Sequence, residues 1–228
     1  MVKGKFDIYV YADWIGLDGP VQIGILSAHF AKAKKALSFQ YNKKWLAKGL
    51  YRLLDPDIAF YSGPQYPTHK ENFGIFLDSM PDTWGKTLMK RREAQDARAK
   101  GKNAKTLYEI DYLLGIYDEG RMGALRFKTD ENGPFLDNDE RNPTPPWSSL
   151  GDLQEAVKQL ENHTQNDTVK QWIAVLIAPG SSLGGARPKA NILDAEKNLW
   201  IAKFPSKTDM VDKAAWEYLT YKLAIGCG

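Results

Sequence analysis

The sequence contains very little cysteine and histidine. Its 228 residues include one cysteine, Cys227, and three histidines. One cysteine cannot form a disulfide within the chain, which is typical of proteins from a reducing compartment. Structural zinc sites need four close thiolate or imidazole ligands, so we expect no zinc site and assign no metal ligand.

Long apolar runs are also missing. The longest, Trp172–Ala178, is far shorter than the roughly 20 residues that a membrane-spanning helix needs. The first residues, Met1–Lys5, lead into a strand-like pattern rather than into the apolar segment of a signal peptide. The sequence therefore predicts a cytoplasmic protein with no membrane partner.

The composition is that of a folded protein, with 43% hydrophobic and 26% charged residues. The net charge of +3 says little about partners, but the charge is unevenly distributed. Lys86–Lys105 holds eight basic and two acidic residues, whereas Thr129–Arg141 holds five acidic residues and one basic residue. We interpret the basic run as a solvated helix face. A docking surface for nucleic acid or for an acidic protein is the alternative, and salt-dependent DNA binding would test the nucleic-acid interpretation.

Alternating apolar and polar residues near the N-terminus predict β-strands. A turn at Gly16–Pro20 separates the first two of them, which is typical of a hairpin. Later, Pro81 and Asp82 suit the first turn of a helix. In chain order we expect strands at Phe6–Val10, Val21–Leu26 and Leu37–Tyr41, helices at Asp82–Ala99 and Thr106–Leu114, and a strand at Ala124–Phe127.

A stretch rich in proline, glycine and acidic residues, 129–147, predicts a linker or insertion. It separates an N-terminal subdomain, 1–128, from a second part, 148–228. The predicted fold class is α+β. In the second part we expect helices at Ser149–Glu161 and Val169–Ala178, strands at Arg187–Leu193 and Leu199–Phe204 around a turn at Asp194–Asn198, and a helix at Asp209–Ala224.

The segment Pro179–Lys189 is the most informative for chemistry. Three glycines and two serines occupy positions 180–185, where small residues let backbone N–H groups approach an anion. A flexible helix-to-strand loop is the plain alternative. A Walker A loop is excluded, because Ala186 rather than lysine follows Gly185.

A serine hydrolase is also excluded. Gly180, Ser182 and Gly184 match the spacing of a nucleophile elbow, which needs a later acid and then a histidine. Because no histidine follows His163, that order cannot be built.

A lysine, Lys203, lies within the apolar strand segment Leu199–Phe204. Such a lysine is costly unless its ammonium finds a partner. In kinases, a strand lysine after the phosphate loop contacts ATP phosphates and pairs with a helix carboxylate. Glu217, on the following helix, is the natural candidate for that carboxylate. The alternative is an edge-strand lysine that points to water.

Several segments, in this order, resemble the HipA-type toxin kinases over the whole chain. Asp78–Gly85 reads DSMPDTWG and resembles the family's Asp-Ser-x-Pro-Asp-x-Trp-Gly. Arg121–Phe127 reads RMGALRF and resembles its Arg-x-Gly-Ala-Leu-Arg-Phe. Ser182–Lys189 matches Ser-x-x-Gly-Ala-Arg-x-Lys, and Ala202–Ser206 follows as AKFPS.

The resemblance implies a serine/threonine kinase that uses ATP and Mg²⁺, with an N-terminal subdomain followed by a kinase-like N-lobe. It implies a toxin of a toxin–antitoxin system that phosphorylates a translation component such as an aminoacyl-tRNA synthetase. The implied partner is a HipB-like DNA-binding antitoxin, so DNA is contacted only indirectly.

By motif position, the resemblance also assigns site residues. Ser182 matches the family's autophosphorylated serine, and a phosphate there would add about −1.5 to −2 charges where ATP phosphates bind. Glu217 is the expected partner of the ATP-contacting lysine. The residues assigned to ATP binding are Ser181, Ser182, Leu183, Gly184, Gly185, Ala186, Arg187, Lys189 and Lys203.

The family's catalytic Asp and Asn and its Mg²⁺-binding Asp belong to a C-terminal lobe and have no counterpart here. We therefore assign no catalytic residue and expect no kinase activity, and weak or absent ATP binding, from the chain alone. We expect the C-terminus to be a cut within a longer kinase. The alternative is a naturally short, non-catalytic binding module that docks an antitoxin or a separate catalytic chain.

Two further groups of residues receive structural interpretations. Asp78 and Asp82 are expected to cap a helix N-terminus rather than to act as paired acids. Five tryptophans lie in segments with helix or strand periodicity, and we expect them to pack in the core: Trp84, Trp147, Trp172, Trp200 and Trp216.

Overall fold

The computed structural model describes residues 4–31, 34–49, 52–138, 144–162, 176 and 185–227. It contains helices and two antiparallel sheets, so the predicted α+β class is confirmed. The chain forms two compact units. Unit 1 comprises Met1–Pro81 and Leu107–Asp139, and unit 2 comprises Asp82–Thr106 and Glu140–Gly228. This division differs from the predicted one, because residues 82–106 belong to unit 2 rather than to the N-terminal subdomain.

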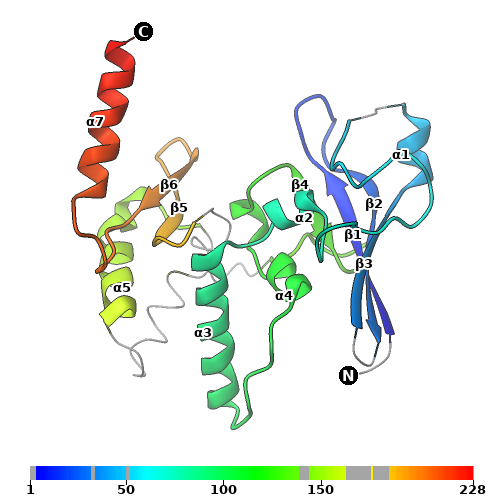
Figure 1. Cartoon of the computed structure of the whole chain (residues 1–228), viewed down its shortest axis with the longest axis horizontal. Helices are drawn as coiled ribbons and strands as arrows, with labels where there is room; N and C mark the ends of the chain where they lie inside the picture. The colour runs from blue at the N-terminus through cyan, green and yellow to red at the C-terminus, as the bar shows by residue number, and fades with distance from the viewer. Residues whose placement is uncertain are drawn as a thin grey trace. The chain divides into compact units, whose positions relative to one another are not determined.

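Unit 1 is built on a four-stranded antiparallel sheet with the strand order β3-β2-β1-β4 (Figure 1). Its strands are β1 (Gly4–Ala12), β2 (Val21–Ala31), β3 (Lys34–Tyr41) and β4 (Leu125–Lys128). The predicted period-two segments all lie in these strands. The helices of the unit are α1 (Lys43–Ala47), α2 (Gly74–Asp78), α4 (Glu109–Leu114) and the 3₁₀ turn η1 (Asp118–Gly120).

The core of unit 1 lies where the sheet meets these short helices. Ile8 and Val10 of β1 are fully buried, as the alternation in that strand predicts. Phe39 of β3 is at the centre of an aromatic group, with its ring centroid 5.0 Å from that of Tyr41 and 5.5 Å from that of Phe76 in α2. Edge-to-face and tilted pairs of this kind add to the energy of burial.

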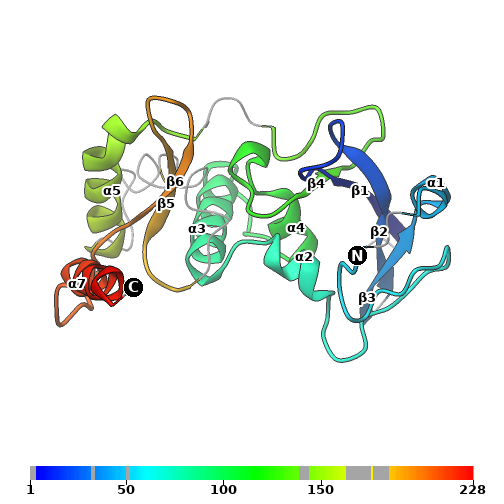
Figure 2. The same cartoon turned by 90° about the horizontal axis from the view of Figure 1, so that it is seen from above.

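Unit 2 combines helices with a two-stranded hairpin. Its elements are α3 (Thr83–Ala99), η2 (Trp147–Ser149), α5 (Leu150–Asn162), β5 (Lys189–Leu193), β6 (Leu199–Lys203) and α7 (Lys213–Gly226). Helix α5 lies beside the hairpin (Figure 2) and buries Leu153, Val157 and Leu160 on one face. The predicted turn at 194–198 is present, since Asp194 accepts hydrogen bonds from the Asn198 backbone N (2.7 Å) and the Trp200 ring (2.8 Å).

Helix boundaries differ from the predictions where a later residue caps the helix. α4 begins at Glu109 rather than Thr106, because Tyr108 is extended and its N–H donates to Asp111 at 2.9 Å. α7 begins at Lys213 rather than Asp209, because the Asp212 carboxylate accepts from the Ala215 N–H. The helix predicted at Val169–Ala178 lies outside the described residues except for position 176.

The strand predicted at Arg187–Leu193 begins instead at Lys189. Asp82 caps α3 as predicted, whereas Asp78 is the last residue of α2 and does not cap α3.

Within the described parts of the chain, none of the helices combines the length and the apolar character of a membrane-spanning segment.

The prediction that the tryptophans pack in the core is correct for Trp84, which is 6% exposed, and wrong for two others. Trp200 in β6 is 53% exposed and Trp216 in α7 is 59% exposed. Strand and helix periodicity does not reveal whether anything covers the apolar face. The structure describes neither Trp172 nor the surroundings of the Trp147 side chain.

Helix α7 carries large apolar side chains but has no buried residue, and it projects beyond α5 and the hairpin of its unit (Figure 1). Strand β6 is exposed as well. We use the name apolar surface for the exposed large apolar side chains of β6, of α7 and of the segment between them: Leu199, Trp200, Ile201, Met210, Val211, Trp216, Tyr218, Leu219, Tyr221, Leu223 and Ile225. Soluble chains rarely leave large contiguous apolar patches uncovered.

Candidate functional site

The residues assigned to ATP binding are only partly within the described chain. Ser181, Ser182, Leu183 and Gly184 lie outside it. Gly185 and Ala186 are exposed just before β5, and Gly185 has a φ of 102°, a conformation that favours glycine. Arg187 and Lys189 follow, and the hairpin register places Lys189 directly opposite Lys203 of β6.

The predicted contact between Lys203 and Glu217 is present in unit 2. The Lys203 Nζ lies 2.8 Å from Glu217 Oε2 and joins β6 to α7. Both side chains are exposed, at 55% and 59% respectively. The hydrogen bond from Lys203 and its positive charge lower the pKa of Glu217 below the ordinary value. An exposed pair contributes little to stability, so its main effect is to orient the two side chains.

Lys189 has a different environment from Lys203. Its side chain is 6% exposed, and its Nζ lies 3.0 Å from Oδ2 of Asp82, which is 11% exposed. The same ammonium donates to the Gly185 carbonyl oxygen at 3.2 Å. The sequence reasoning predicted Asp82 as a cap and missed this pairing. The available signal was the rule that a buried lysine needs a nearby carboxylate.

Arg187 is also paired with a carboxylate. Its Nη2 lies 2.6 Å from Oδ2 of Asp209, and the same oxygen accepts the Ser206 N–H at 3.0 Å. The three basic residues assigned to ATP binding, Arg187, Lys189 and Lys203, are therefore each paired with a carboxylate from a different segment. Of these three, only Lys203 is more than half exposed, so its ammonium is the most accessible of the three to an anion from solvent.

The basic run Lys86–Lys105 occupies α3 and the segment after it. Five of its eight basic residues are exposed, which agrees with the predicted solvated face. Arg91 differs, because its guanidinium reaches across to α5 and donates to the Leu160 carbonyl oxygen at 2.9 Å.

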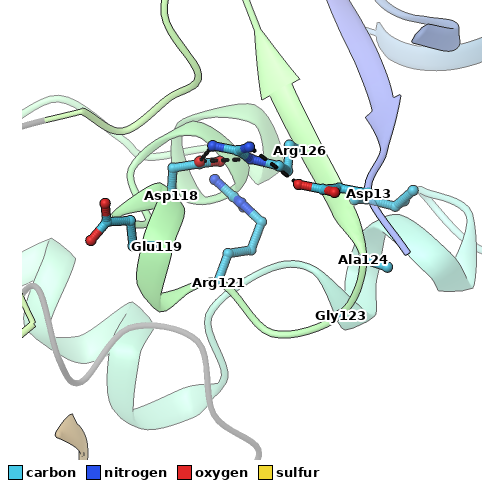
Figure 3. Close-up of a pocket in the computed structure, with 8 residues that line it drawn as sticks. Asp13, Asp118, Glu119, Arg121, Gly123, Ala124 and Arg126 are labelled. Atoms are coloured by element: carbon cyan, nitrogen blue, oxygen red, sulfur yellow. Dashed lines mark hydrogen bonds and ion pairs between the residues drawn. The ribbon is translucent and has the colours of Figure 1, made fainter. Parts of the chain in front are cut away.

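Unit 1 contains a separate polar cavity of about 350 Å³ (Figure 3). At its wall, the Arg126 guanidinium lies between two carboxylates and contacts Asp118, and Asp13 at 3.2 Å. Burial lowers the pKa of Arg126, but the hydrogen bonds and charges of both carboxylates outweigh it and raise the pKa above the ordinary value. Glu119 is turned away from this network (Figure 3). These pairs tie β4 to η1 and to the end of β1.

The other arginine of the RMGALRF segment, Arg121, also lies at this cavity and is buried. Its guanidinium donates to four backbone carbonyl oxygens of unit 1 at 2.8 to 3.1 Å. Burial lowers its pKa to about 10, so it stays charged at neutral pH. The four acceptors are the carbonyls of Ser79, Leu113, Ile116 and Leu136.

The chemistry available at the two places is therefore different. The cavity in unit 1 holds arginines and carboxylates that neutralise one another, which is an arrangement for holding strands and turns together. The hairpin and α7 of unit 2 offer an accessible lysine with an orienting carboxylate. Among the described residues, no group of His, Cys, Asp and Glu side chains could hold a metal ion.

Comparison with family models, with curated proteins and with solved structures finds no match for this chain.

Proposed function

We propose that the chain is the N-terminal portion of a HipA-like serine/threonine kinase toxin and that unit 2 contributes to its ATP-binding site. In this proposal ATP binds with Mg²⁺, and the substrate is a translation component such as an aminoacyl-tRNA synthetase. A HipB-like DNA-binding antitoxin is the neutralising partner, and autophosphorylation of Ser182 regulates the kinase. The cytoplasm is the proposed location.

The observation that carries the proposal is the contact between Lys203 and Glu217. A strand lysine oriented by a helix carboxylate is the arrangement that kinases use to hold ATP phosphates. The residue types and their order along the chain predict this contact, and its length is 2.8 Å. The exposure of Lys203 leaves its ammonium accessible to a phosphate group.

The apolar surface independently supports the proposal that a further lobe of the kinase packs against unit 2. Aromatic side chains bury about 150–250 Å² each when covered. The four aromatic residues of the apolar surface are each more than half exposed: Trp200, Trp216, Tyr218 and Tyr221. We propose that the catalytic C-terminal lobe of the kinase covers α7 and β6.

The first experiment is the mass of the native protein in its host, measured with an antibody raised against this chain. The proposal expects a mass far above 25.7 kDa, the mass of the 228 residues. A mass near 25.7 kDa would contradict the proposal that this chain is part of a longer kinase.

The second experiment measures Mg·ATP binding to the chain by saturation-transfer NMR at millimolar nucleotide, a concentration suited to weak binding. We expect a weak signal that Lys203→Ala removes and that Lys222→Ala leaves unchanged. Lys222 is the matched control, because it lies on α7 and contacts only the Tyr218 ring among the described residues. Equal signals from both variants would refute the role proposed for Lys203. No transfer of phosphate is expected from the chain alone.

The apolar surface also favours a second candidate function, a naturally short module that binds another protein without catalysis. This candidate expects a native mass near 25.7 kDa and no Mg·ATP signal. The two experiments together therefore separate the candidates.

A further inference from the structure

Two segments that are far apart in the sequence meet in unit 2. The N-terminal turn of α3 supplies Asp82 and Trp84, and both contact Lys189, which begins β5. Asp82 and Lys189 are 107 positions apart. The Trp84 ring N–H donates to the Lys189 carbonyl oxygen at 3.1 Å, and the Asp82 carboxylate binds the Lys189 ammonium. One residue of β5 is therefore held at its backbone and at its side chain.

The two oxygens of Asp82 have separate partners. Oδ1 accepts the Gly85 N–H at 2.9 Å and caps α3, and Oδ2 binds the Lys189 ammonium at 3.0 Å. An uncharged Asn would serve equally well as the cap. The carboxylate is needed only for the buried ammonium, which is unfavourable without a counter-charge.

The Lys189 ammonium also binds the segment that precedes β5. It donates to the Gly185 carbonyl oxygen at 3.2 Å, so the carboxylate, the ammonium and the carbonyl form a chain of hydrogen bonds. A Cβ placed on Gly185 would lie 3.4 Å from the Lys189 Nζ, so the backbone of Gly185 is held close to the ammonium. The backbone of Gly185 has a φ of 102° at this contact, a conformation that favours glycine.

We propose that Asp82 is a positioning residue that fixes the segment 185–189 through Lys189. The helix cap would survive loss of its charge, and Trp84 already holds the backbone of β5. The role left for the Asp82 carboxylate is to hold the Lys189 ammonium in its hydrogen bond to the Gly185 carbonyl oxygen. This inference rests on the proposed function, because segment 185–189 matters to catalysis only if it adjoins bound nucleotide.

The experiment compares three variants: Asp82→Asn, Lys189→Met and the double variant. Asp82→Asn keeps the cap and leaves a buried ammonium without a counter-ion, so we expect its thermal stability to fall. The double variant removes both charges and fills the space with an apolar side chain, so its stability should largely recover. Asp96→Asn is the control, an exposed acid on the same helix.

Amide hydrogen exchange, measured by NMR, separates positioning from stability. We expect the amides of Gly185, Ala186 and Arg187 to exchange at least tenfold faster in the double variant than in the native chain. The amide of Ile192, within the hairpin, should be unchanged. Native exchange rates at 185–187 in a double variant of recovered stability would overturn the proposal.

Mg·ATP binding to the same variants gives a second readout. If the native chain binds Mg·ATP, the double variant should bind at least tenfold more weakly despite its recovered stability, and equal affinity would overturn the proposal. Absence of Mg·ATP binding to the native chain is compatible with a kinase whose C-terminal lobe is elsewhere, so the native mass decides the proposed function in that case. The exchange rates still decide in that case whether Asp82 positions the segment.

Discussion

Replacing Arg121 by Met should strongly destabilise unit 1. Arg121 is only 7% exposed, and its guanidinium donates four hydrogen bonds to backbone carbonyls, at 3.0, 2.8, 3.1 and 2.8 Å. Methionine is an unbranched side chain that fills irregular space but donates no hydrogen bond. The substitution therefore removes the donors while leaving much of the packing in place.

The magnitude follows from the acceptors that are left behind. A buried polar group that loses its partner costs about 1–3 kcal/mol, so four carbonyls cost roughly 4–12 kcal/mol. Removing the buried guanidinium recovers several kcal/mol of desolvation energy. The net loss is about 3–5 kcal/mol, the difference between these two opposing contributions. A typical domain has only about 5–15 kcal/mol of stability in total.

The assay is urea unfolding followed through the NMR signals of Ile8 and Val10, which report on unit 1 alone. With a slope of about 1–3 kcal/mol per molar urea, the midpoint should fall by at least about 1 M. Arg52→Met is the matched control, since Arg52 is exposed and lies over the Trp14 ring at 4.9 Å. Its loss should cost about 1 kcal/mol or less. A loss below about 1 kcal/mol for Arg121→Met would refute the argument from orphaned carbonyls.

Three further predictions follow from the geometry. The pKa of Glu217 should rise toward its ordinary value in Lys203→Ala, as measured by carboxyl ¹³C titration, because the lysine lowers it. In the native chain the ion pair is complete above the ordinary pKa of Glu217 and is lost as the pH falls through the lowered value; an unchanged titration would contradict the pairing. Gly24→Ala should lower the urea midpoint of unit 1, since its Cβ would lie 2.5 Å from the Phe39 ring; an unchanged midpoint would contradict the close approach. Leu223→Glu should reduce binding of a hydrophobic dye, yet change stability by only about 0.5 kcal/mol because the side chain is 61% exposed; a larger loss would mean that Leu223 is covered.

Local sequence patterns were sufficient for much of the fold. Period-two alternation located β1, and a proline followed by a capping acid located the start of α3. The five-residue helices α1 and α2 were missed because a single turn carries almost no periodic signal. The predicted starts of α4 and α7 were too early, because each helix begins after a later residue, Tyr108 or Asp212, than the sequence pattern indicated.

The candidate site was predictable only where its residues are near in sequence. Lys203 and Glu217 are 14 positions apart on a strand and the next helix, so the kinase pattern brings them together. The pairing of Asp82 with Lys189 spans 107 positions, and no local pattern carries it. The exposure of Trp200 and Trp216 was likewise beyond local pattern, because burial depends on what covers a face.

The division of the chain has a consequence for protein synthesis. Helix α3 belongs to unit 2 but emerges from the ribosome long before the strand it contacts, with Lys189 made 107 positions after Asp82. At about 5–20 residues per second, the helix waits roughly 5–20 s for β5. Trp84 and Leu88 are buried in the finished unit, so during that interval they lack part of their final surroundings. Nascent chains halted before residue 189 should therefore be the species that chaperones recognise.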